Sequence, residues 1–179
     1  TLGGLWILLW RLSWRWWGLV PVAAGIALAL MAQRPDMLIA SDARTIALRG
    51  EDGRLHFPRP PKDRFAAARW LLRDGDGRDW RDAVGEASLS CDGLGCIADR
   101  NGLVIAMSSR PESLEADCDR ADIVVSAAPL IPCAKPRLAL GARQIADGGG
   151  YAITLSPLRA ISVNRQRGAR PWVITEPVQ

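Results

Sequence analysis

The chain has 179 residues, of which 49% are hydrophobic, with 23 Lys and Arg against 19 Asp and Glu and a single histidine. This length allows one ordinary domain and a small appendage. The lone imidazole, His56, excludes every mechanism or metal site that needs a cluster of histidines.

The first 32 residues are almost uncharged, with Arg11 and Arg15 as their two charged side chains. The run from Trp16 to Ala32 has no charge and is about as long as the shortest segments that cross a bilayer, roughly 17 residues. Five of the eight tryptophans lie in the first 17 positions, and tryptophan favours the membrane interface. We therefore expect residues 1–32 to be a membrane segment: the end of one span, an Arg/Trp-rich loop and a final transmembrane helix at about 16–32.

A cleaved signal peptide is the alternative for this segment, and it requires a charged start, a short apolar core and a small-residue cleavage site. Here the arginines follow an apolar decapeptide, and the hydrophobic run ends in Gln33-Arg34-Pro35, which favours an anchor. The short loop that holds Arg11 and Arg15 should face the cytoplasm by the positive-inside rule. Residues 33–179 are then expected to form a domain on the periplasmic or extracytoplasmic side of a bacterial inner membrane.

The exported part alternates strand and helix signals along its length. Asp63 is a candidate N-cap for an amphipathic helix that continues to residue 73, and a second short helix is predicted at 111–117 with a helical turn at 142–146. This order predicts an α/β fold, with α+β as the alternative. Apolar and β-branched runs predict strands at 37–40, 45–48, 54–57, 95–98, 103–107, 122–126, 137–140, 151–155 and 160–164.

All four cysteines lie in this exported part, which suits a compartment that permits disulfides. Three pairings are possible. The short intervening loops favour Cys91 with Cys96 and Cys118 with Cys133. A four-thiolate zinc site is the alternative, but the usual C-x2-C spacing is absent.

The C-terminal section is basic, with seven Lys and Arg against two acidic residues in 135–179. Such a section offers contacts to DNA phosphates or anionic headgroups. Scattered, solvated arginines are the plainer interpretation. The candidates for such contacts are Arg159, Arg165, Arg167 and Arg170.

Several segments in this order resemble the C-terminal end of the ComEC family of competence proteins, multi-span inner-membrane proteins associated with passage of transforming single-stranded DNA. The resemblance covers essentially the whole chain. It rests on the Trp/Arg-rich apolar region, Arg34-Pro35-Asp36, the hairpin ALRGEDGRL, the cysteine pair around DGLG, the run Ala121-Asp122-Ile123-Val124-Val125-Ser126, and Arg167-Gly168-Ala169-Arg170-Pro171-Trp172.

The resemblance implies that residues 33–179 form a metallo-β-lactamase-like αββα sandwich. Active members of that fold bind metal through an HxHxDH motif. This chain instead has Ser41-Asp42-Ala43-Arg44 after its first strand, and its 122–126 strand leads to Ala127-Ala128-Pro129. The resemblance therefore implies a degenerate domain with no metal, no other cofactor and no catalytic residue. Asp42 and Asp122 are candidate remnants of ligand positions, and His56 is expected to be structural.

The leading hypothesis is a non-catalytic C-terminal domain of a ComEC-like inner-membrane channel that takes up transforming single-stranded DNA. Its partners would be the rest of its own channel, the lipid bilayer through residues 1–32, and single-stranded DNA if the domain itself binds it. Two alternatives remain. One is a metal-dependent nuclease with a nonstandard carboxylate site. The other is a membrane-anchored, disulfide-stabilised domain unrelated to DNA.

Overall fold

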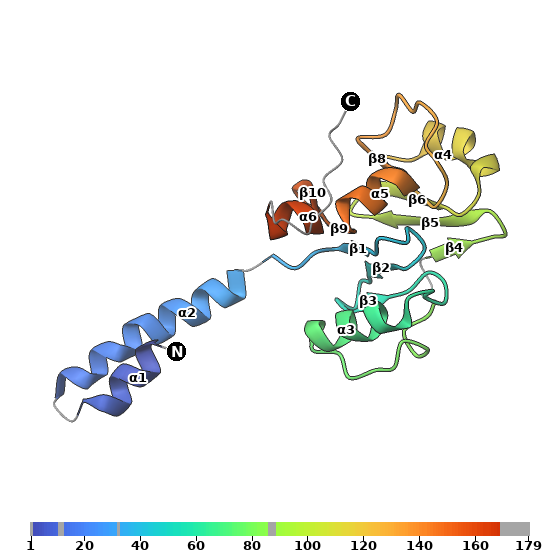
Figure 1. Cartoon of the computed structure of the whole chain (residues 1–179). Helices are drawn as coiled ribbons and strands as arrows, with labels where there is room; N and C mark the ends of the chain where they lie inside the picture. The colour runs from blue at the N-terminus through green and yellow to red at the C-terminus, as the bar shows by residue number, and fades with distance from the viewer. Residues whose placement is uncertain (1, 11–12, 32, 86–88, 169–179) are drawn as a thin grey trace. The chain divides into compact units, whose positions relative to one another are not determined.

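The computed structural model describes residues 2–10, 13–31, 33–85 and 89–168 (Figure 1). The chain divides into two compact units, Thr1–Arg34 and Pro35–Gln179. This division falls within two residues of the domain boundary predicted from composition and charge.

The first unit contains the α-helices α1 (Leu2–Leu9) and α2 (Leu19–Met31), joined through the 3-10 helix η1 (Ser13–Gly18). The helix predicted at about 16–32 therefore becomes α-helical only at Leu19. Within the described ranges, no helix has both the length and the apolar character needed to cross a membrane.

Two glycines allow α1 and the end of η1 to approach each other closely. A Cβ on Gly18 would lie 2.7 Å from Ile7 Cγ1 and 2.8 Å from the carbonyl oxygen of Gly3. A Cβ on Gly3 would likewise lie 2.6 Å from the carbonyl oxygen of Gly18. Because only glycine permits such an approach, the chain turns here and packs against α1.

The second unit holds two five-stranded sheets in its described part. The first is antiparallel throughout, in the order β10-β9-β1-β2-β3. The strand prediction at 160–164 is wrong at its end, because Ser162 Oγ accepts a hydrogen bond from Arg165 N and caps helix α6 (Val163–Arg167). The strands are β1 (Met37–Ile39), β2 (Ile46–Arg49), β3 (Leu55–His56), β9 (Tyr151–Leu155) and β10 (Leu158–Ser162).

The second sheet is mixed, in the order β4-β5-β6-β7-β8. β4, β5 and β6 are antiparallel, whereas β6, β7 and β8 run parallel. A parallel connection needs a crossover, and the 3-10 helix η2 (Pro111–Ser113) with α4 (Leu114–Arg120) supplies it between β6 and β7. The strands are β4 (Leu89–Cys91), β5 (Gly95–Arg100), β6 (Leu103–Ser108), β7 (Ile123–Ser126) and β8 (Leu138–Leu140).

Period-2 alternation along the strands builds three hydrophobic layers. Met37 and Ile39 enter the core between the two sheets, whereas Leu38 packs on the opposite face with helix α3 (Arg64–Asp74). In the second sheet Ile105 faces the central core and Ala106 packs toward α4. Figure 1 shows α3 and α4 on the outer sides of the two sheets.

The unit is thus a mixed α/β domain with facing sheets, which confirms the predicted fold class at that level. The predicted cap of α3 is also confirmed: Asp63 Oδ1 accepts from Ala66 N at 2.9 Å, and Gly75 ends the helix with φ 79°. Helix α5 (Ala142–Gly148) lies where a helical turn was predicted and contributes the fully buried Ile145 to the central core.

Candidate functional site

A pocket of about 300 Å³ opens where loops from both sheets meet. The first sheet contributes the turn after β1, the start of β2 and the loop after β3. The second sheet contributes the start of β5, the end of β6 and the residue after β7. The lining residues are Ala43, Arg44, Ile46, Pro58, Arg59, Pro60, Lys62, Cys96, Met107, Ser108, Ser109 and Ala127.

The turn after β1 is fixed by the carboxylate of Asp42. Its Oδ1 accepts hydrogen bonds from Arg44 N at 2.9 Å and Thr45 N at 2.8 Å, and its Oδ2 accepts from Thr45 Oγ1 at 2.8 Å. These bonds hold the buried Ala43 in the left-handed region at φ 54°. Asp42 therefore shapes the pocket wall through the backbone, and its carboxylate is not among the lining groups.

The same bonds set the ionisation of Asp42. Burial by itself raises the pKa of this carboxyl, but the hydrogen bonds from Thr45 and Arg44, helped by the charge of Lys62, bring the pKa below its ordinary value. Asp42 is therefore ionised at neutral pH, and its carboxylate oxygens accept the hydrogen bonds that form the turn.

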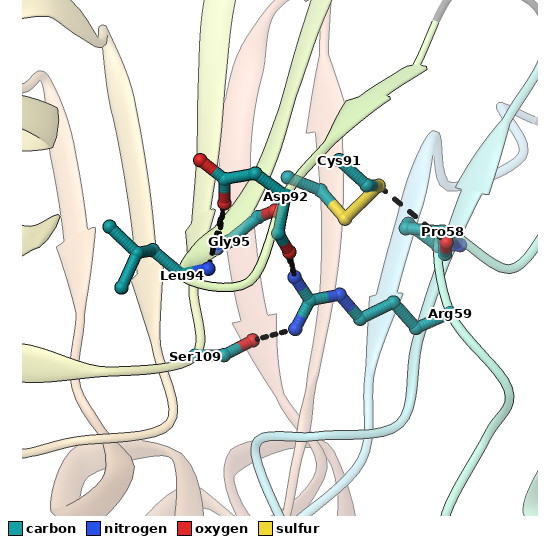
Figure 2. The surroundings of a disulfide bond; sticks show 8 residues. Pro58, Arg59, Cys91, Asp92, Leu94, Gly95 and Ser109 are labelled. Atoms are coloured by element: carbon teal, nitrogen blue, oxygen red, sulfur yellow. Dashed lines mark hydrogen bonds between the residues drawn. A yellow bond between two sulfur atoms is a disulfide. The ribbon is translucent and has the colours of Figure 1, made fainter.

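Arg59, in the loop after β3, joins the two sheets at the pocket (Figure 2). Its Nη1 donates to Ser109 Oγ at 2.7 Å, and its Nη2 donates to the carbonyl oxygens of Asp92 and, at 2.9 Å, Gly95. Asp92 Oδ1 in turn accepts from the backbone amides of Leu94 and Gly95. A guanidinium offers donors in a fixed plane, so these contacts hold Arg59 in one orientation.

The structure pairs Cys91 with Cys96 and Cys118 with Cys133 as two disulfides, with Cα atoms 4.0 Å and 5.4 Å apart. This is the pairing that the short loops favoured. The first disulfide closes the turn that presents Asp92 and Gly95 to Arg59, and Cys96 also lines the pocket. The second ties α4 to the loop before β8 and lies outside the pocket lining.

Asp122 has a structural role at the far end of β7. Its Oδ2 accepts from Val104 N at 2.9 Å, and its backbone amide donates to the Val104 carbonyl. Ala127 follows the other end of the strand and lines the pocket. At about 3.3 Å per residue, five residues separate Asp122 from Ala127 by roughly 16 Å. Asp42 and Asp122 therefore do not form one carboxylate site. Over the described ranges, no group of three or more His, Cys, Asp or Glu side chains is placed to hold a metal ion.

His56 lies on β3, where its Nε2 is 3.1 Å from both carboxylate oxygens of Asp52 across the hairpin turn. Its side chain is 12% exposed. His56 is not among the pocket lining, so it serves the hairpin, as the strand position predicted.

The basic residues predicted as contacts lie elsewhere. Arg159 is exposed on β10, and Arg165 and Arg167 are exposed on α6, whereas Arg170 is outside the described residues. None of the three described arginines lines the pocket. Sequence reasoning missed the cations that do, Arg44, Arg59 and Lys62. Of these three, only Arg44 had a signal in the sequence. It ends the Ser41–Arg44 segment, and active members of the resembled fold hold metal ligands at that place.

No protein-family model, curated protein or solved structure matches this chain.

Proposed function

We propose that this chain is the C-terminal region of a ComEC-like inner-membrane channel that takes up transforming single-stranded DNA, and that its second unit is a non-catalytic, degenerate metallo-β-lactamase-like domain. The layer order supports this proposal. α3 packs on the outer face of one sheet, α4 packs on the outer face of the other, and the main core lies between the sheets. This is the αββα order of the metallo-β-lactamase fold.

One observation carries the proposal. The turn after β1 and the residue after β7, where active members of the resembled fold hold metal ligands, meet at the same pocket. Here those positions are Ala43, Arg44 and Ala127. The charged side chains of the lining are all cationic, so the pocket attracts an anion and repels a metal ion. On this proposal the domain retains the scaffold of a phosphodiesterase-like site, but the pocket is lined by cationic side chains in place of metal-binding ones.

The first unit supports a membrane location for the chain. Its helices expose large apolar side chains, which water disfavours and a bilayer accommodates. The rings of Trp6, Trp10 and Trp14 pack with centroids 4.8–5.7 Å apart, as an aromatic cluster suited to the membrane interface. Among the described residues of this unit, five large apolar side chains are each at least 70% exposed: Leu2, Leu8, Leu9, Trp17 and Leu28. We infer that residues 1–32 embed in the inner membrane alongside the rest of the channel.

The function is tested by removing residues 35–179 from the protein in a transformable bacterium that carries it. We expect externally added DNA still to reach the periplasm, while the number of transformants falls to the level of a strain that lacks the whole protein. The matched control is the intact protein with the same epitope tag at equal membrane abundance. Normal transformation by the truncated strain would assign the domain to a function unrelated to DNA.

The proposed orientation is tested by thiol labelling of intact cells with a membrane-impermeant maleimide. We expect labelling of the four cysteines only after an impermeant reductant is added, because outside the cytoplasm they persist as disulfides. Labelling that requires cell lysis and no reductant would place the domain in the cytoplasm.

A further inference from the structure

The pocket contains hydrogen-bond donors that the described part of the chain does not use. Three of the five N–H groups of Arg59 are donated, to Ser109 Oγ and to the two carbonyls of the disulfide-closed turn. Two donors remain on a guanidinium whose position is already fixed. Ser109 Oγ accepts from Arg59, which leaves its own O–H available to donate.

Two more cations complete the lining. Arg44 and Lys62 are exposed, and neither side chain has a hydrogen-bond or ion-pair partner in the described part of the chain. Asp42 is the carboxylate whose ionisation responds to Lys62, but its oxygens already accept three hydrogen bonds from its own turn. The net charge of the lining side chains is therefore positive.

Apart from Ser108, the rest of the lining is apolar. Ile46, Met107 and Pro58 contribute hydrocarbon surface, and no acidic side chain lines the pocket. Arg44, Arg59, Lys62 and Ser109 line one pocket from separate loops, and a tetrahedral phosphate offers them more acceptor oxygens than a planar carboxylate does.

We infer that this pocket binds a phosphate group through Arg44, Arg59, Lys62 and the Ser109 hydroxyl. The volume of about 300 Å³ is several times that of a water molecule, about 30 Å³, so it admits a phosphate together with part of the group that carries it. The pocket is the one on which the proposed function depends. The natural source of the phosphate would be the backbone of a DNA strand, and this assignment rests on the proposed function.

Calorimetric titration of the full chain, oxidised and in a non-ionic detergent, tests this inference. One arm uses inorganic phosphate and the other uses oligothymidylate with hydroxyl ends, whose phosphates are all diesters. Binding of both supports a phosphate site open to a strand. Binding of inorganic phosphate alone supports the site and overturns the strand as its source. Binding of neither overturns the inference.

Two matched variants show where the ligand binds. The pocket variant is Arg44→Glu with Lys62→Glu, and the control is Arg159→Glu with Arg165→Glu, all four residues being exposed. Each pair changes the net charge by the same amount. We expect the pocket variant to bind at least about tenfold more weakly, and the control to bind like the wild type.

Urea unfolding midpoints check that both variants fold. If the two pairs of substitutions weakened phosphate binding equally, the effect would come from net charge alone, which would contradict a pocket site. If only the control pair weakened phosphate binding, the binding site would lie in the C-terminal section, and the pocket site would be contradicted. Because these titrations do not involve the channel, phosphate binding can succeed while the transformation experiment fails, or the reverse, so the two proposals are overturned separately.

Discussion

Arg59 and Ser109 are joined by a 2.7 Å hydrogen bond between the guanidinium Nη1 and the hydroxyl oxygen. The two residues are 50 positions apart and follow strands of different sheets, so this bond ties the loop after β3 to the residue after β6. The pocket lies where these two segments meet.

Replacing Arg59 by lysine should destabilise the domain. A lysine has one nitrogen and cannot reach Ser109 Oγ and the carbonyls of Asp92 and Gly95 from one plane. We expect the free energy of unfolding to fall by about 1–3 kcal/mol in urea titrations. Arg81→Lys is the control, since the Arg81 side chain is 65% exposed and solvent screens its surface ion pair with Asp79, so the change should leave the stability nearly unaltered. Equal midpoints for the two variants would contradict a structural role for Arg59.

The two disulfides should have separable effects. Replacing Cys91 and Cys96 by serine opens a short loop, and replacing Cys118 and Cys133 opens a longer one, at costs of about 2 and 3 kcal/mol in unfolding free energy. The first pair holds the turn that orients Arg59, so its loss should also weaken phosphate binding, while the second should leave binding unchanged. Titration calorimetry of both variants below their unfolding transitions distinguishes these effects. Equal phosphate binding by the two variants would show that the first disulfide does not affect binding in the pocket.

The stability of the domain should depend on the ionisation of Asp42. Because the pKa of Asp42 is lower in the folded protein than its ordinary value of 3.8, its stabilising charge is present above that value and is lost as the pH falls through the folded pKa. Asp42→Asn should cost about 1 kcal/mol at pH 7, a modest value because the site is partly open to solvent. The difference should shrink as the pH falls below about 3.8. Unfolding free energies of both proteins between pH 7 and 3 provide the comparison, and a difference independent of pH would be the contrary result.

Gly18 should be essential for the packing of α1 against its neighbour. A Cβ at position 18 would press against Ile7 and the Gly3 backbone, whereas a Cβ at position 25 on α2 would meet no atom within 4 Å, so Gly18→Val has Gly25→Val as its control. The near-UV circular dichroism of the Trp6, Trp10 and Trp14 cluster reports this packing. We expect the first variant to lose the coupled tryptophan signal and the second to keep it. Retention of the signal in both would show that the close approach is dispensable.

Local patterns predicted much of the fold. Apolar and β-branched runs predicted β1, β6 and β9, and the Asp63 cap placed α3 to within a residue of its start. β4 was missed because its three residues carry one large apolar side chain, Leu89, and it forms a sheet edge. The break at Gly18 was missed because it depends on a contact with Gly3, which no local pattern contains.

The pocket was harder to predict than the strands. Arg44, Arg59 and Ser109 come from three loops separated by long stretches of sequence, and no periodicity links them. The sequence offered candidate contacts only in the basic C-terminal section, where scattered solvated arginines were the plainer interpretation, because local charge density can be counted along a sequence and proximity in space cannot. The Ser41–Arg44 segment was noticed only through the metal ligands that it lacks, and the structure shows what its residues form instead.

The most direct measurement of the central claim is entry of labelled DNA into the cytoplasm of cells that carry the pocket variant, Arg44→Glu with Lys62→Glu. The control cells carry Arg159→Glu with Arg165→Glu at the same membrane abundance. We predict that the pocket variant stops DNA entry while periplasmic uptake continues, and that the control imports DNA like the wild type. Normal entry in the pocket variant would contradict a role for this pocket in DNA uptake.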